Sequence, residues 1–205
     1  MRYEPSNDQL REEFSDLSSE SLILEKEVYA HFGLLFMKFG LVEHSMVNVL
    51  TFRGVGDALH ARKIRSRDDW ERTFDLSYEN AKAMTFGSMT KRVLEIAEFK
   101  DIESHLKETK RLRDYFAHHF MREESRFFST EDGCWFLLRK IGAVRHAVIE
   151  VEELLQPRFA SMCSRLKLPS ISDEQLSSMR ESYLGETREA LVSGKAKPGW
   201  DSNAL

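Results

Sequence analysis

The sequence has no apolar run approaching the roughly 20 residues that a membrane-spanning helix needs, so we expect no transmembrane segment. Its first residues, MRYEPSNDQLREEFSD, are polar and acidic, unlike a secretory signal or an arginine-rich transit peptide. The two cysteines, Cys134 and Cys163, are too few for a disulfide framework or a cysteine-based zinc site. We therefore expect a cytoplasmic protein. Such cysteines more often serve as small core residues, and we assign neither a functional role.

The chain also lacks the excess of positive charge that broad, nonspecific nucleic-acid binding requires. Its formal net charge is -4, whereas such binding comes mainly from neutralising phosphates with Lys and Arg. A local basic site remains open in two stretches, ARKIRSR at residues 61–67 and KETKRLR at residues 107–113. The competing interpretation of each stretch is a solvated surface.

Proline and glycine are scarce, with four and ten residues, and the apolar spacing between them is mostly helical. We predict an all-α fold, a four-helix bundle with additional short helices. The four long helices are expected at residues 22–52, 84–99, 101–126 and 139–166, and Pro157 should kink or interrupt the last. A break is expected at RGVGD, residues 53–57, followed by an irregular or short-helical basic connection over residues 56–84.

The stretch RFFSTEDGCWFLL contains an Asp-Gly pair between β-prone residues. It predicts a small hairpin near residues 127–138 or a turn between helices. We expect one domain of bundle over residues 22–166, with an N-terminal extension at 1–21. A peripheral helix should follow at 167–192 and a mobile tail at 193–205.

The third predicted helix carries the stretch RLRDYFAHHF, residues 111–120. At about 100° per residue, Asp114, His118 and Arg111 lie together on its polar side. Asp114 could therefore accept a hydrogen bond from one imidazole nitrogen of His118 and fix the tautomer of the other. The alternative is an ordinary surface pair four residues apart.

Arg113 falls near the centre of the apolar stripe of the same helix, so it must find a partner or point into a shared polar cleft. Glu43 has the matching position on the first helix, between Phe36, Phe39 and Leu50. One explanation is a buried ion pair between Glu43 and Arg113, which could coexist with a function.

The stretch RDYFAHH resembles the R-x4-6-H motif of HEPN domains, the higher eukaryote and prokaryote nucleotide-binding superfamily. Arg113 and His118 match its ends, and Asp114 occupies the polar position that commonly follows the arginine. The segments FGLVEHSM and MTFGSMTKRV, which precede the motif helix, also look like HEPN proteins. The resemblance covers roughly residues 22–166.

The resemblance implies a metal-independent endoribonuclease, needing no cofactor, that cleaves single-stranded RNA through its own 2′-OH. His118 would be general acid or base, Arg113 would clamp the phosphate, and Asp114 would position the histidine. Many such proteins are homodimeric toxins with a cognate antitoxin protein, or phage-defence or RNA-processing enzymes. The alternative is a non-catalytic HEPN module that binds RNA, a nucleotide or a partner protein.

The motif register has alternatives, since Arg111 with His118 and Arg113 with His119 also satisfy the spacing. We assign Arg111, His119, Arg122 and Glu43 auxiliary or RNA-binding roles, while His119 has the simpler interpretation of a structural or surface histidine. Arg113 and His118 are about 140° apart around one helix, so two chains would be needed to join them at one phosphate. A metal site drawn from Glu43, His44, His118 or His119 is the weakest hypothesis, because bundle-type ligand spacing is not evident.

Overall fold

The computed structural model describes residues 23–168 and Glu181, and among them the chain forms six α-helices, two short 3-10 helices and no strand. The prediction of an all-α fold is confirmed. The elements are α2 (Ile23–His60), α3 (Arg67–Lys82), α4 (Phe86–Leu94), η3 (Ala97–Ile102), α5 (Glu103–His118), α6 (Phe120–Glu124), η4 (Ser125–Ser129) and α7 (Glu131–Arg165).

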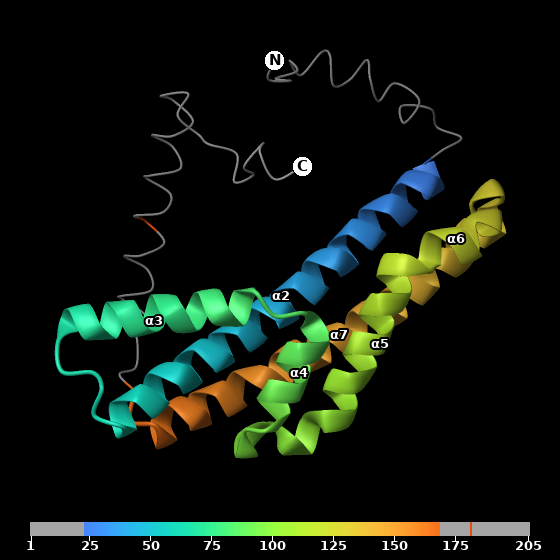
Figure 1. Cartoon of the computed structure of the whole chain (residues 1–205). Coiled ribbons are helices and arrows are strands. Elements are labelled where there is room, and N and C mark those ends of the chain that lie inside the picture. The colour runs from blue at the N-terminus through green and yellow to red at the C-terminus, as the bar shows by residue number, and fades with distance from the viewer. Residues whose placement is uncertain (1–22, 169–180, 182–205) are drawn as a thin grey trace, which may run out of the picture. The chain divides into compact units, whose positions relative to one another are not determined.

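The two longest helices, α2 and α7, lie side by side and run in the same direction (Figure 1). Along α2, a buried residue recurs every seven positions, at Val28, Leu35, Val42 and Val49. Contacts with α7 proceed in the same direction along both helices, from the ion pair of Lys38 with Glu152 to the ring contact of Phe52 with Phe159. A strict seven-residue repeat keeps one side of a helix facing its neighbour over many turns.

Aromatic side chains fix α5 against α2. Phe116 and Phe120 are buried and stack on each other with ring centroids 4.7 Å apart. Phe32 lies 5.3 Å from Phe120, and Phe39 lies 6.4 Å from Phe116. Such ring pairs contribute beyond their buried area. This cluster therefore determines which side of α5 is buried and leaves its polar side in solvent.

The predicted break at residues 53–57 is wrong, because α2 continues to His60. Its two glycines permit close packing instead of a turn. A Cβ added at Gly54 would lie 2.6 Å from Oγ of Ser77, and one at Gly56 would lie 2.7 Å from Cδ1 of Leu166. Glycine here lets neighbouring side chains approach the helix backbone.

The expected connection over residues 56–84 contains a full helix, α3, which packs against the C-terminal half of α2. Its N-cap is Ser66, whose side chain accepts a hydrogen bond from the backbone N–H of Asp69. The next predicted helix, 84–99, is shorter than expected. α4 is capped by Thr85 and ends at Leu94, and η3 follows it.

The hairpin expected near residues 127–138 is also wrong. These residues form the end of η4 and the first turns of α7, which begins at Glu131 rather than near Arg139. Thr130 is the N-cap, and its hydroxyl accepts from the N–H of Gly133. A Cβ at Gly133 would lie 2.0 Å from the carbonyl oxygen of Phe127, so this glycine is needed for close approach in a helical turn.

The remaining predictions concern Pro157 and the chain ends. Pro157 lies inside α7, which continues beyond it to Arg165. The predicted segments 1–21 and 193–205 lie outside the described residues, as does nearly all of 167–192. Within the described residues, no helix is long and apolar enough to span a membrane.

Candidate functional site

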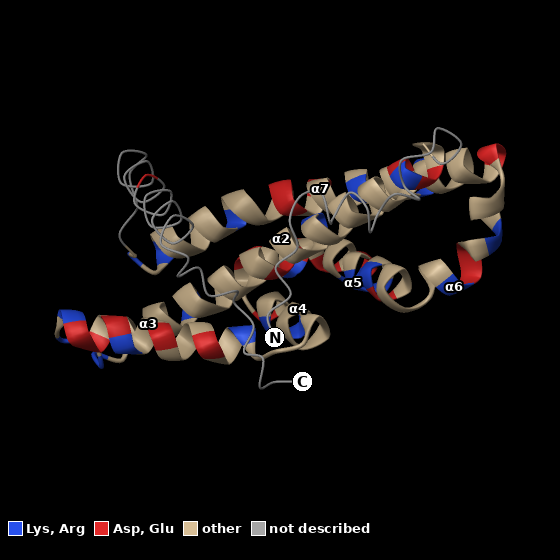
Figure 2. Ribbon diagram, turned by 90° about the horizontal axis from the view of Figure 1, so that it is seen from above, with Lys and Arg blue, Asp and Glu red and all other residues tan. Residues whose placement is uncertain are grey.

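The polar side of α5 carries the residues that the sequence analysis selected. Because α5 is continuous through His118, the seven- and four-residue spacings place Arg111, Asp114 and His118 on one side of it. His118 is solvent-exposed in the last turn. Lys and Arg alternate with Asp and Glu along α5 and α6 (Figure 2). The motif therefore lies on an accessible, charged helix face.

Asp114 is directed to two cations. Its Oδ2 accepts a 2.6 Å hydrogen bond from Nζ of Lys110, and its Oδ1 lies 3.3 Å from Nη1 of Arg113. The hydrogen bond from Lys110 is the main cause that lowers the pKa of Asp114, and burial opposes it. No hydrogen bond joins Asp114 to His118 among the described residues. Asp114 thus stays ionised and orients two cations in this structure.

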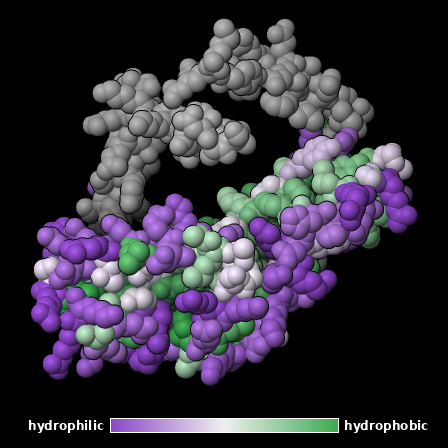
Figure 3. All heavy atoms as spheres, in the orientation of Figure 1, coloured by the Kyte–Doolittle hydropathy of each residue, from purple (hydrophilic) through white to green (hydrophobic). Residues whose placement is uncertain are grey.

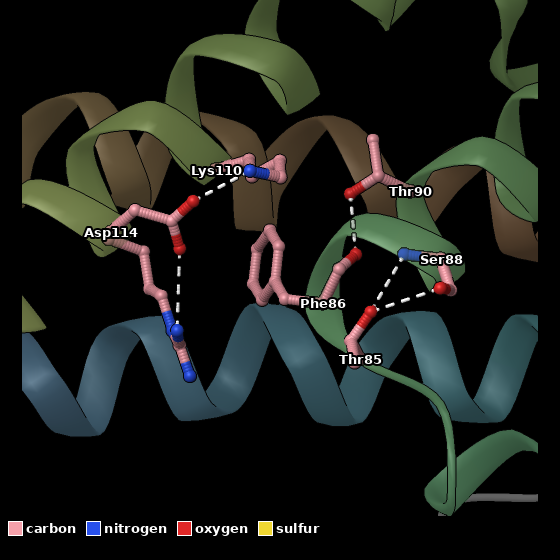
Figure 4. A network of polar contacts seen from close by, with 7 residues as sticks. Thr85, Phe86, Ser88, Thr90, Lys110 and Asp114 are labelled. Carbon is pink, nitrogen blue, oxygen red and sulfur yellow. Dashed lines mark hydrogen bonds and ion pairs between the residues drawn. The ribbon is translucent and has the colours of Figure 1, made fainter.

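Lys110 is held in place by α4 as well as by Asp114. Figure 4 shows Lys110 reaching Asp114, with Phe86 of α4 beside the pair. A Cβ added at Gly87 would lie 2.8 Å from Cε of Lys110, so the aliphatic part of the lysine lies over this glycine. The hydroxyl of Thr85 caps α4 by accepting from the N–H of Ser88. The start of α4 therefore supports the lysine stem and leaves its ammonium group on the polar side of α5.

A surface pocket of about 340 Å³ adjoins this face, and we call it the α5 hollow. Its lining combines three cations, a carboxylate, a phenol and an imidazole, from Lys107, Lys110, Arg111, Asp114, Tyr115 and His119. The hollow thus brings together three predicted site residues, Arg111, Asp114 and His119. His118, Arg113, Arg122 and Glu43 do not line it.

All three cations in the hollow are paired with acids on the same helix, and Lys110 with Asp114 is one of these pairs. Glu108 receives two hydrogen bonds from Arg111, at 2.8 and 2.6 Å, and Glu103 lies 2.5 Å from Lys107. Lys107 and Arg111 are both about two-thirds exposed. Exposed pairs of this kind are worth about 0.2–1 kcal/mol, so a phosphate can compete with the carboxylates for these cations. The lining is therefore suited to a polyanion despite its internal pairs.

His119 interrupts the helical path between α5 and α6. Its backbone angles, φ -122° and ψ -36°, are not those of a regular helix. Its Nδ1 lies 2.8 Å from Nη2 of Arg122 and 3.3 Å from Oε1 of Glu123. An unprotonated Nδ1 can accept from Arg122, whereas a protonated one can donate to Glu123. The imidazole thus has both a guanidinium and a carboxylate as partners at the edge of the hollow.

A polar network lies behind the hollow and was not predicted. The Tyr115 hydroxyl donates to Oε1 of Glu124 at 2.6 Å, and Nζ of Lys140 lies 2.8 Å from the phenol and 2.5 Å from the same carboxylate oxygen. Burial tends to raise the pKa of Glu124, but hydrogen bonds from Lys140 and Tyr115 hold it below its ordinary value. The network ties α5, α6 and α7 together beneath His119.

A sequence signal for this network existed. Glu124 follows Phe116 and Phe120 at four-residue spacing, so an acid continues the apolar stripe of the motif helix. Such an acid requires a buried partner. The partner, Lys140, lies 16 residues further along the chain, and helix periodicity alone does not identify it.

The predicted contact between Glu43 and Arg113 is not formed, because neither a hydrogen bond nor an ion pair joins them among the described residues. Arg113 contacts Asp114 and remains about one-third exposed. Arg122 is largely exposed and reaches His119. Within the part of the chain that the structure describes, no three His, Cys, Asp or Glu side chains cluster as a metal site would need.

Comparisons of the chain with protein-family models, with curated proteins and with solved structures find no match. The geometry of α5 and its surroundings is therefore the basis for the functional proposal.

Proposed function

We propose that the protein is a metal-independent endoribonuclease of HEPN type that binds single-stranded RNA along the polar side of α5. The observation that carries the proposal is the α5 hollow, where Lys107, Lys110 and Arg111 gather beside His119. Exposed His118 lies on the same side of α5, as its spacing from Arg111 and Asp114 requires. Cations beside histidines supply the two things that RNA cleavage needs, phosphate binding and proton transfer.

The proposed reaction needs no water as nucleophile. A histidine acting as base removes the proton of the 2′-OH, and that oxygen attacks the adjacent phosphorus. The bond from phosphorus to the 5′-oxygen breaks, and this oxygen takes a proton from a second acid. The products are a 2′,3′-cyclic phosphate and a free 5′-OH. Permanently charged arginines stabilise the extra negative charge on the phosphate in the transition state.

A second chain supplies what one α5 helix cannot. Arg113 lies on a different side of α5 from His118, and the hollow contains neither of them. A two-fold contact between α5 helices places Arg113 of one protomer beside His118 of its partner. In this proposal the carboxylate of Asp114 aligns Arg113 and Lys110, and Arg111 binds a flanking phosphate.

A second candidate function has its own supporting observation. Arg111 is held by two hydrogen bonds to Glu108, and Asp114 is directed to Lys110 and Arg113 rather than to a histidine. This arrangement favours a binding module that holds RNA or a nucleotide without cleaving it. The RNA or nucleotide in that case is bound at the same side of α5.

Cleavage of an end-labelled single-stranded RNA in EDTA separates the two functions. The ribonuclease produces 2′,3′-cyclic phosphate ends and leaves DNA of the same sequence intact, because DNA has no 2′-OH. His118→Ala abolishes cleavage, whereas His146→Ala, at an exposed histidine of α7, retains it. Saturable binding without products supports the binding module. Absence of both binding and cleavage contradicts both functions.

The salt dependence of RNA binding shows whether the hollow contacts phosphates. Each lost phosphate contact on single-stranded RNA makes the negative slope of log affinity against log salt shallower by about 0.7. We expect Lys107→Ala and Arg111→Ala to make the slope shallower by about this amount each. Lys91→Ala, at an exposed lysine of α4 outside the hollow, is expected to leave it unchanged.

A further inference from the structure

The side of α2 that faces away from α7 has a seven-residue repeat of its own. In its C-terminal half this side is buried at Val47, Thr51 and Val55, where α3 packs against α2. Gly54 belongs to the same set and permits the close approach of Ser77 from α3. This half of the side is therefore an established helix–helix contact.

The N-terminal half of the same side has no helix over it among the described residues. Counting back from Val47 and Gly54 by sevens gives Gly40 and Gly33, and a Cβ added at either meets nothing within 4 Å. We define the α2 outer face as the residues that surround these glycines, namely Ala30, Gly33, Leu34, Met37, Gly40 and Leu41. All six are exposed.

The α2 outer face is apolar and large enough to indicate a partner. Leu34 is 43% exposed, Met37 55% and Leu41 37%. With Phe36 at its edge, the large side chains leave on the order of several hundred Å² of apolar surface uncovered, a size typical of interaction sites. Figure 3 shows hydrophobic side chains along this half of α2. A helix that is apolar on opposite sides is normally covered on both.

Charge restricts the class of partner. From residue 28 to residue 42 the only Lys, Arg, Asp or Glu is Lys38, and it turns away to Glu152 on α7. The face thus offers nothing to bind a nucleic acid or a charged peptide and no charge that a protein partner would have to desolvate. The matching surface is another apolar helix face.

We propose that the α2 outer face is a self-association surface that packs antiparallel against the same face of a second copy of this chain. Gly33, Met37, Gly40 and His44 follow the alternating four- and three-residue spacing of a coiled-coil seam. In antiparallel packing, Met37 lies over Gly40 of the second copy, and His44 lies over its Gly33. Large side chains thus meet glycines on both halves of the two-fold contact, as an isologous interface requires.

This surface is separate from the contact between α5 helices, and it does not rest on the proposed ribonuclease activity. The α5 contact uses the polar side of α5. The self-association surface uses the apolar side of α2, whose C-terminal half is covered by α3. If both contacts form, the protein assembles beyond a dimer, and the loss of either contact reduces the assembly to a dimer.

Molar mass as a function of concentration, by sedimentation equilibrium of the full chain, tests the proposal. The test variant combines Gly33→Gln with Gly40→Gln. Glutamine is a better helix former than glycine, by roughly 0.5–1 kcal/mol at each position, and its Cβ meets nothing within 4 Å among the described residues. The protomer should therefore be at least as stable as the wild type, while the longer side chains keep two α2 helices apart.

We expect the wild type to associate and the double variant to lose one two-fold step, with its dissociation constant raised at least tenfold. Gly142→Gln is the matched control, because Gly142 is also a helical glycine with nothing within 4 Å but lies on α7. It should leave association unchanged. A wild type that stays monomeric up to about 100 μM, or a double variant with the wild-type dissociation constant, overturns the proposal.

The antiparallel direction has its own readout. In a background with Cys134→Ala and Cys163→Ala, Met37→Cys protein mixed with Gly40→Cys protein should form a disulfide-linked heterodimer under mild oxidation. Cross-linking of each variant with itself, in preference to the mixture, indicates a parallel contact and overturns the antiparallel arrangement.

A wild type that is monomeric until residues 1–21 are deleted indicates that the chain's own N-terminal segment covers the face, and this result also overturns the proposal.

Discussion

The hydroxyl of Tyr115 donates a 2.6 Å hydrogen bond to Oε1 of Glu124, and Lys140 of α7 donates to the same oxygen. Glu124 is buried, so its charge depends on these two donors. The bond connects the motif helix α5 to α6 across the irregular backbone of His119. It thereby fixes the direction in which the chain leaves the candidate site.

We predict that Tyr115→Phe lowers the free energy of unfolding by about 1–2 kcal/mol, because it removes a hydrogen bond to a buried charge. Tyr29→Phe is a matched control, since the Tyr29 hydroxyl also donates to a glutamate, Glu25, at 2.8 Å but on the exposed surface. Its effect should stay within about 0.5 kcal/mol. Urea unfolding measures both, and equal effects would show that the buried network adds nothing.

The same network predicts a pH dependence of stability. The pKa of Glu124 lies below its ordinary value of 4.5, so its ionised form is favoured in the folded protein. Its contribution is complete above pH 4.5 and is lost as the pH falls through the folded pKa. The destabilisation by Glu124→Gln should thus be largest near pH 7 and shrink towards pH 3. A destabilisation that is the same at both pH values contradicts this account of Glu124.

The start of α7 predicts opposite effects of one substitution at two glycines. Gly133→Ala should lower the free energy of unfolding by about 1–3 kcal/mol, because its Cβ would lie 2.0 Å from the carbonyl oxygen of Phe127. Gly142→Ala, with open space around it, should raise stability by up to about 1 kcal/mol. Thermal unfolding measures both changes. If Gly133→Ala proves neutral, the turn between η4 and α7 differs from the one described.

Local periodicity predicted the parts of the fold that depend on neighbours within one helix. The buried side of α2 and the polar side of α5 follow from three-, four- and seven-residue spacing, and both appear in the structure. The errors arose where a glycine makes room for a neighbouring segment. Gly54, Gly56 and Gly133 suggested turns, yet each accommodates an atom of another segment.

The candidate site shows the same division. Spacing placed Arg111, Asp114 and His118 on one side of the helix, because that relation is internal to α5. The interruption at His119 has no Gly or Pro to mark it, and it coincides with the network of Tyr115, Glu124 and Lys140. The position of this interruption in the chain depends on packing against α7. So does the presence of His119 in the lining of the hollow.

Complementation between two inactive variants tests the central claim, that paired α5 helices cleave RNA at shared sites, most directly. His118→Ala and Arg113→Ala proteins are each expected to be inactive towards single-stranded RNA in EDTA. After the two are mixed and their subunits exchanged, half of the dimers carry one intact site, so we predict about a quarter of wild-type activity. If exchanged dimers cleave no more RNA than either variant alone, or if the wild type cleaves none, the central claim is contradicted.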